Sequence, residues 1–373
     1  MNNNFPYQGF EQGPIRPPSE AYSLLIRVTR NCPWNRCTFC PVYKSTRFSA
    51  RPIEHIINDI DIIHKYITIL QETGMQIAVA AKKIEPNELQ AFEAAVHWIQ
   101  GGMQSIFIQD ANSLVIKPSD MIRILEHMKK RFPFIQRITS YARSDTIARI
   151  KSEDLKAMAG AGLNRIHIGL ESGSDQVLKM VQKGVTKAIH IKAGFKVKTA
   201  SMELSEYVMP GLGGQAMWEN HALETADALN QINPHFIRMR TLAISPGLKL
   251  YEDYRSGVFE KCSELMTVKE IRLLIENLQG ITSIIKSDHI LNLFQDLEGK
   301  LPEAKNHLLH IIDTFLGMEP MQQCIYQVGR RLGVFTGLRD MESPQKLAYA
   351  QQMCARFNVT PEPAAARGAC THL

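Results

Sequence analysis

The sequence lacks three features that mark common classes of protein. No stretch reaches eighteen unbroken apolar residues, and the chain begins with neither a charged start nor an apolar run. Lys and Arg are spread along the chain rather than gathered in one block, although the formal net charge is +6. We therefore expect a soluble cytoplasmic protein without a membrane partner, whose charge reflects a solvated surface more than a nucleic-acid partner.

Cysteine is also scarce, with seven residues in a chain of 373. Four of them are scattered without paired spacing, which argues against a secreted disulfide framework and favours a reducing compartment. These four are Cys262, Cys324, Cys354 and Cys370. Since no two of them are close in sequence, we expect small apolar core residues rather than ligands of a second cluster.

Between residues 22 and 246 the sequence alternates between strand-like and helical segments. The strand-like segments are 22–29, 105–110, 135–142, 165–170, 202–211 and 235–245. Apolar residues at helical spacing predict helices at 52–74, 86–100, 118–132, 152–162, 174–200 and 216–232. Six such units predict parallel strands with right-handed crossovers, either in an open doubly wound sheet or in a barrel that lacks a quarter of its wall.

The sequence predicts a division of the chain into four parts. We assign a leader at 1–21, the strand–helix repeat at 22–246, a mostly helical region at 247–358 and a flexible tail at 359–373. In the third part, 267–280 and 302–318 have the spacing of amphipathic helices, whereas 283–294 is ambiguous between strand and helix.

The remaining three cysteines lie within nine residues, in the segment RVTRNCPWNRCTFC directly after the first strand. Thiolates spaced as Cys32, Cys37 and Cys40 can hold three irons of a cubane [4Fe–4S] cluster and leave the fourth iron open. Two alternatives are a structural zinc, with a fourth ligand such as His55 or His64, and simple burial of small side chains.

The segment RVTRNCPWNRCTFCPVYK, followed by six strand–helix units, resembles the radical S-adenosylmethionine (radical SAM) superfamily over about residues 22–246. The resemblance implies an α/β fold with a partial (β/α)6 TIM-like barrel. It also implies a site-open [4Fe–4S] cluster on Cys32, Cys37 and Cys40, and S-adenosylmethionine as the second cofactor. Most members use C-x3-C-x2-C, so this chain has one extra residue between the first two cysteines.

In that family an electron from the cluster cleaves S-adenosylmethionine to a 5′-deoxyadenosyl radical, which abstracts hydrogen from a substrate. The resemblance implies an external one-electron donor such as flavodoxin or ferredoxin. The stretches GLESGSDQVLKMVQKG and MPGLGG look most like the branch with coproporphyrinogen oxidase-like and tRNA-modifying members. The substrate and the catalytic residues stay open, and the alternative is a non-catalytic protein that carries a structural zinc or an electron-transfer cluster.

The resemblance also assigns cofactor contacts to loops at the carboxyl ends of the strands. Phe39 precedes the last cysteine, as the family's aromatic residue does, and Asp110 and Asn112 replace its usual amine-binding turn. The other expected contacts are Arg143, Glu171, Ser172 and Gly211.

Other interpretations of some of these residues remain open. Ser172 or Ser174 is equally suited to cap the next helix, and Arg143 to lie on a solvated strand end. Arg238 and Arg240 alternate on the sixth strand, where they either meet an acidic substrate inside the barrel or form ion pairs outside it.

Overall fold

The structure, a computed structural model, describes residues 6–361 of the chain. These residues form two compact units, and the chain passes between them several times. The first unit contains the N-terminal residues up to Asn35 together with Val42–Ile168 and Lys192–Leu204. The second contains Arg36–Pro41, Gly169–Ile191 and the chain from Ser205 onward.

The first unit is built on four parallel strands, hydrogen-bonded in the order β1, β4, β5 and β6. Their bounds are Leu24–Arg27, Ser105–Gln109, Arg137–Ala142 and Leu163–Glu171, and the last strand continues into the second unit. All of β4 is buried, as expected for an apolar strand with neighbours on both edges. The register pairs Leu24 with Ile106 and Ile106 with Ile138, so aliphatic side chains share one face.

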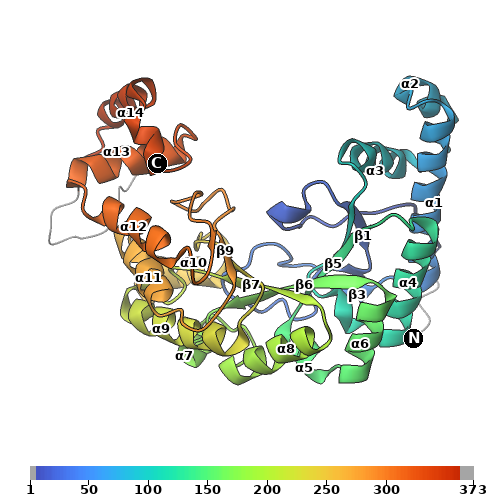
Figure 1. The fold of residues 1–373 in the computed structure, drawn as a ribbon, viewed down its shortest axis with the longest axis horizontal. Coiled ribbons are helices and arrows are strands. Elements are labelled where there is room, and N and C mark those ends of the chain that lie inside the picture. Colours follow the sequence, from blue (N-terminus) through green and yellow to red (C-terminus); the bar gives the residue numbers. More distant parts are fainter. Residues whose placement is uncertain (1–5, 362–373) are drawn as a thin grey trace. The chain divides into compact units, whose positions relative to one another are not determined.

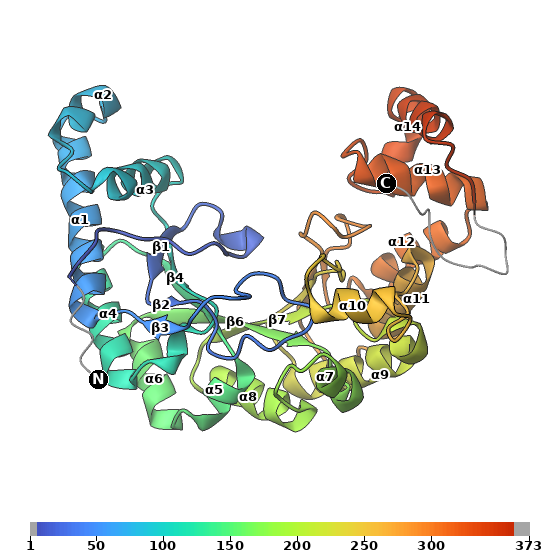
Figure 2. The same cartoon turned by 180° about the vertical axis from the view of Figure 1, so that it is seen from behind.

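The helices of the first unit pack through aliphatic faces and one aromatic cluster. Their bounds are Ile53–Glu72 (α1), Ile77–Ala80 (α2), Leu89–Gln100 (α3), Pro118–Arg131 (α4), Ser144–Arg149 (α5) and Ser152–Ala161 (α6). α3 lies beside α1 in both views (Figure 1, Figure 2). Trp98 of α3 is fully buried, meets Phe132 edge-on at a centroid distance of 5.0 Å and donates to the Ser105 carbonyl at 2.9 Å. The extra helix predicted at 86–100 is therefore part of the core.

The second unit continues the alternation with short strands. Their bounds are Glu203–Val208 (β7), Phe236–Met239 (β8), Ile284–Lys286 (β9) and Gly299–Lys300 (β10). β7, β8 and β9 are parallel, and β10 runs antiparallel to β9. In register, Glu206 pairs with Ile237 and Ile237 with Ile285, and all three are fully buried.

Most of the chain after β8 is helical. The helices of the second unit include α7 (Asp175–Met180), α9 (Gly214–Ile232), α10 (Lys249–Arg255), α11 (Glu264–Glu276), α12 (Lys305–Leu316), α13 (Pro320–Arg331) and α14 (Pro344–Arg356). α13 and α14 lie side by side in both views (Figure 1, Figure 2). The fold is thus α/β, a partial (β/α)6 barrel with a mostly helical C-terminal region, and the predicted fold class is confirmed.

Two details of the predicted secondary structure need correction. The helix predicted at 174–200 is wrong in its middle, because the chain forms α7 and then α8 (Lys187–Thr199). Between them Gln182 and Gly184 have φ angles of 52° and 71°, a left-handed backbone that no helix continues through. The ambiguous segment 283–294 contains only the three-residue strand β9, followed by turns.

Two further expectations concern the ends of the chain and the membrane. Most of the predicted flexible tail, and Cys370 within it, lies outside the described residues. Within residues 6–361, each helix is too short or too polar to cross a bilayer.

Candidate active site

The cysteine loop is closed at its base by a two-stranded ribbon in the first unit. β2 (Thr29–Arg30) pairs antiparallel with β3 (Ser49–Ala50), so the chain leaves and returns at one place. Inside the loop, the Asn31 amide donates to a main-chain carbonyl at 2.5 Å, and the Asn35 amide donates to the Tyr43 carbonyl. Both asparagines have positive φ, a conformation that Asn tolerates better than most residues.

The tip of the loop, Arg36–Pro41, is held within the second unit by backbone hydrogen bonds. The Cys40 N–H points to the Cys37 carbonyl at 3.4 Å, which makes a tight turn. The Thr38 N–H donates to the Val181 carbonyl at 3.0 Å, and the Thr38 carbonyl accepts from the Leu250 N–H at 3.2 Å. Two separate segments of the second unit thus fix the backbone between the last two cysteines.

The thiols of the loop suit an iron–sulfur cluster by number and chemistry. Cys32, Cys37 and Cys40 are in no disulfide, and the first and last are partly exposed. Three thiolates are the protein ligands of a site-open [4Fe–4S] cluster. No three His, Cys, Asp or Glu side chains of residues 6–361 are arranged as ligands of a single metal ion. The cysteine ligand set therefore stays a prediction that rests on the donor atoms and their spacing.

The two histidines considered as a fourth zinc ligand lie against aromatic rings of the first unit. The His55 ring meets Tyr7 edge-on at a centroid distance of 5.4 Å. His64 lies 5.9 Å from the ring of Phe132. These contacts give both imidazoles a packing role on α1.

Phe39, Lys183 and Glu171 come together in the second unit. The Phe39 ring is 8% exposed, and the Lys183 ammonium lies 5.9 Å from its centroid. The same ammonium lies 3.1 Å from Oε1 of Glu171. Glu171 has a φ of 62°, and its carbonyl accepts from the Met209 N–H at 3.0 Å. The expected cofactor residues Phe39 and Glu171 are therefore linked by one lysine.

Two serines organise the turn after Glu171. Ser174 is the N-cap of α7, since its hydroxyl accepts from the Val177 N–H. That hydroxyl also donates to the Asn220 amide oxygen at 2.6 Å. The hydroxyl oxygen of Ser172, fully buried, accepts from the Ser174 N–H at 3.0 Å. The capping interpretation thus holds for Ser174, and Ser172 supports the cap.

A second carboxyl group, Glu206 of β7, lies near the Lys183–Glu171 pair. Its side chain is fully buried, and neither carboxylate oxygen has a hydrogen-bond partner among the residues that the structure describes. Burial raises its pKa well above the usual range; the positive charge of Lys183 works against this shift, and the Glu171 carboxylate adds to it. Glu206 is therefore protonated well above the pH at which an exposed glutamate ionises.

The turn that follows β7 is held by a carboxylate from the C-terminal region. Gly211 has a φ of 87°, which favours glycine. Its N–H donates to both Glu270 oxygens, at 3.0 and 3.1 Å. Nδ1 of His221 lies 2.8 Å from Oε1 of Glu270, and Nε2 lies 3.2 Å from the carbonyl of Glu171. One buried network therefore joins the loops after β6 and β7.

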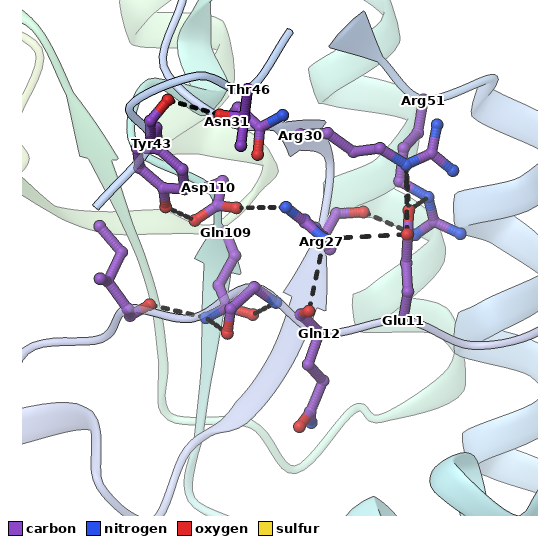
Figure 3. A network of polar contacts seen from close by, with 12 residues as sticks. Glu11, Gln12, Arg27, Arg30, Asn31, Tyr43, Thr46, Arg51, Gln109 and Asp110 are labelled. Atoms are coloured by element: carbon purple, nitrogen blue, oxygen red, sulfur yellow. Dashed lines mark hydrogen bonds and ion pairs between the residues drawn. The ribbon is translucent and has the colours of Figure 1, made fainter. Parts of the chain in front are cut away.

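In the first unit, Asp110 lies in a polar network at the end of β4 (Figure 3). The Arg27 guanidinium donates to Oδ2 at 2.8 Å, and the Tyr43 hydroxyl donates to Oδ1. Burial raises the pKa of Asp110, although Tyr43 and Arg27 both act to lower it. The backbone of Ala111 also hydrogen-bonds to the carboxylate, whose side chain is fully buried.

The N-terminal segment packs over this network (Figure 3). The Gln109 amide accepts from the Gly13 N–H at 2.8 Å and donates to the Ile15 carbonyl at 2.6 Å. Glu11 pairs with Arg30 at 2.9 Å and with Arg51 at 2.5 Å. Residues 11–15 of the predicted leader therefore pack within the first unit.

Asn112 and Arg143 make contacts within the first unit that fix the loop after β5. The Asn112 amide oxygen accepts from the Arg143 N–H at 3.0 Å, and its NH₂ donates to the Thr146 hydroxyl at 2.9 Å. The Arg143 guanidinium lies 5.2 Å from the Trp34 ring of the cysteine loop and donates to Asp145 at 3.0 Å. Arg143 thus packs on the cysteine loop rather than lying on a solvated strand end.

The two arginines of the sixth predicted strand have different surroundings. Arg238 is buried and pairs with Asp288, whereas Arg240 is exposed. Arg238 therefore forms an ion pair, as one of the two interpretations expects, while its place inside or outside the barrel stays a prediction. The scattered cysteines Cys262, Cys324 and Cys354 are buried, as expected for small apolar side chains.

Sequence reasoning missed several residues of these networks. They are Arg27, Tyr43, Lys183, Glu206, His221 and Glu270. Two of them carry a signal in the sequence, because each places a carboxylate on the apolar side of its element. Glu206 lies between Leu204 and Val208 on β7, and Glu270 lies among the buried residues of α11.

Comparison with known proteins shows which protein family the chain matches. Residues 26–226, more than half of the chain, match the family model described as Radical SAM superfamily. Over 178 residues the chain is 29% identical to the 4′-phospho-dehydrooxetanocin synthase of Priestia megaterium. That alignment covers 46% of this chain but only 21% of the synthase, so the chain spans about a fifth of that relative's length.

Two solved structures are similar at low identity. An N-terminally truncated Elp3 of the archaeon Methanocaldococcus infernus is 15% identical, with a TM-score of 0.44, and the match covers 60% of this chain and 58% of that one. Coproporphyrinogen III oxidase (HemN) from Escherichia coli is 13% identical, with a TM-score of 0.46, and the match covers 69% and 52%.

Proposed function

Because this chain belongs to the radical SAM superfamily, we propose that it binds one [4Fe–4S] cluster through Cys32, Cys37 and Cys40 and abstracts hydrogen from an organic substrate. Proteins of this superfamily use such a cluster together with S-adenosylmethionine. When bound, the cluster supplies the electron that breaks S-adenosylmethionine into methionine and a 5′-deoxyadenosyl radical. The observation that carries the proposal is the set of three thiols, in no disulfide, in the loop directly after the first strand.

The protein's own residues would bind and orient the cofactor. Asp110 would accept from the methionyl ammonium in addition to its contacts with Arg27 and Tyr43. Glu171, held by Lys183, would accept from the ribose hydroxyls. The positive φ of Gly211 sets a turn whose backbone can approach a ligand closely.

Other expected residues would act on the loops rather than on the cofactor directly. The contacts of Asn112 and Ser172 are internal, so both would position the segments that carry Arg143 and α7. Arg143 would steady the cysteine loop through Trp34. Phe39 would hold Lys183 in place next to the last cysteine of the loop. An external flavodoxin or ferredoxin would supply the electron.

The test compares two triple variants of the full chain, purified without oxygen. The wild type should hold about four irons, and a variant with alanine at Cys32, Cys37 and Cys40 should lose them. The matched control has alanine at Cys262, Cys324 and Cys354, which are buried outside the loop and should leave the iron content unchanged. Reductant and S-adenosylmethionine should then yield 5′-deoxyadenosine from the wild type and the control only. Stoichiometric zinc without a brown chromophore would instead support a structural metal.

A further inference from the structure

A cavity of about 730 Å³ lies within the second unit. Its wall includes Gly211 of the turn after β7 and the segment 241–244 that follows β8. The carboxyl ends of strands are where ligands bind in folds of this class. Most of the rest of the wall comes from residues 257–271, from Leu291 and Leu293 and from α13, so the C-terminal region completes it.

Two positive charges face this cavity, Lys261 and Arg331. The Arg331 guanidinium is engaged by the Glu264 carboxylate and by the Leu291 carbonyl, the latter at 3.2 Å. Lys261 has no ion pair with any carboxylate in the described part of the chain. Lys261 is partly covered by its neighbours but remains exposed enough for a ligand to reach its ammonium.

The surroundings of Lys261 favour an added negative charge. Desolvation lowers the pKa of Lys261, and the like charge of Arg331 lowers it further. Burial raises the pKa of the neighbouring Cys262 to about 12, so its thiol is neutral at neutral pH. The Glu264 carboxylate pairs with Arg331 rather than with Lys261. Glu260 also lines the cavity, but its carboxylate makes no ion pair with Lys261. An anion beside Lys261 would relieve the repulsion between the two cations.

Much of the remaining lining of the cavity is apolar. Leu242, Ile244, Val268, Ile271 and Leu293 line it. Ligand sites commonly combine such an apolar lining with a few polar groups that fix orientation. A molecule with a hydrocarbon body and one anionic end matches both parts of the wall.

We propose that this cavity binds the substrate, whose anionic group, a carboxylate or a phosphate ester, pairs with Lys261 beside Arg331. This inference rests on the proposed function, because the bound molecule would be the substrate from which a hydrogen atom is abstracted. The charge arrangement itself does not depend on the cluster. Binding is therefore measurable on the full chain without S-adenosylmethionine.

The test titrates inorganic pyrophosphate and citrate into the wild type by calorimetry. Lys261→Ala should weaken the tighter probe by about tenfold to a hundredfold, because one charged contact is lost, whereas Lys261→Arg should retain it. The control is Lys269→Ala, an exposed lysine of α11 outside the cavity wall, which should bind as the wild type does. A preference for pyrophosphate indicates a phosphate ester, and a preference for citrate indicates a carboxylate.

A second readout uses the reactivity of the Lys261 amine. The bound probe should slow the reaction of Lys261 with acetic anhydride and should leave the reaction of Lys269, which lies outside the cavity wall, unchanged. Failure of both probes to bind the wild type, or equal affinity in Lys261→Ala, would overturn the anion site. A lack of 5′-deoxyadenosine with normal probe binding would instead count against the radical chemistry alone.

Discussion

The Glu270 carboxylate accepts the backbone N–H of Gly211 at 3.0 Å, although 59 residues separate them. Both partners are buried, and His221 extends the network from Glu270 to the carbonyl at the end of β6. A helix of the C-terminal region thereby fixes two loops of the candidate site. The helical C-terminal region therefore helps to fix the conformation of the candidate site.

Glu270→Gln should lower both stability and cofactor affinity. Glutamine has the same shape but only one acceptor oxygen, so the Gly211 N–H loses one of its two acceptors and the turn loses its contact with a charged group. Loss of a buried hydrogen bond to a charged group costs about 1.5–3 kcal/mol in the free energy of unfolding, which chemical denaturation measures. The matched control is Glu276→Gln on the same helix, where an exposed pair with Arg272 is worth less than about 1 kcal/mol. Equal effects of the two variants would show that Glu270 does not hold the turn.

Asp110 allows a prediction that separates cofactor binding from folding. Asp110→Asn keeps the size of the side chain and an acceptor for Tyr43 but removes the negative charge. If this carboxylate accepts the methionyl ammonium, the concentration of S-adenosylmethionine needed for half-maximal cleavage should rise about tenfold to a hundredfold. The control, Tyr43→Phe, removes the hydroxyl that donates to Asp110 and leaves the carboxylate in place.

The two variants should therefore differ in which quantity changes. Tyr43→Phe should lower the melting temperature with little change in the cofactor requirement, because the hydroxyl contacts Asp110 within the protein. Asp110→Asn should also lower the melting temperature, because Arg27 loses a buried partner, but of the two variants it alone should change the cofactor requirement strongly. If Asp110→Asn only destabilises the protein and the cofactor requirement holds, the amine site lies in another loop.

The strands and helices that surround the site were largely predictable, and the reasons are local. Apolar residues at alternating or helical spacing placed β4, α4 and α9 within a few residues of their observed bounds. The break between α7 and α8 was missed because left-handed residues at Gln182 and Gly184 interrupt a sequence that otherwise has helical composition.

The side-chain networks were not predictable, because their partners are far apart in the chain. Arg27 and Asp110 are separated by 83 residues, and Gly211 and Glu270 by 59. No local sequence pattern indicates which donor a buried charged side chain will contact, because that contact depends on the three-dimensional fold. Asp110 and Glu171 were correctly predicted to lie at the carboxyl ends of strands, which is where ligands bind in parallel sheets.

Burial of Glu206 should make the stability of the protein depend on pH, and the raised pKa of this residue sets the direction of the dependence. Its folded-state pKa is raised, so its contribution to stability is fully present below the ordinary glutamate pKa and is lost as the pH rises through the folded value. Glu206→Gln removes the ionisable group and keeps a neutral side chain of the same shape. The variant should match the wild type near pH 4 and become more stable at higher pH, by about 1.4 kcal/mol for each pKa unit of the shift. Denaturation midpoints measured from pH 4 to pH 9 test this, with Glu219→Gln, an exposed residue of α9, as the control that should follow the wild type. Parallel curves for the wild type and Glu206→Gln would mean that the carboxyl group is solvated in the folded protein and titrates as an exposed glutamate does.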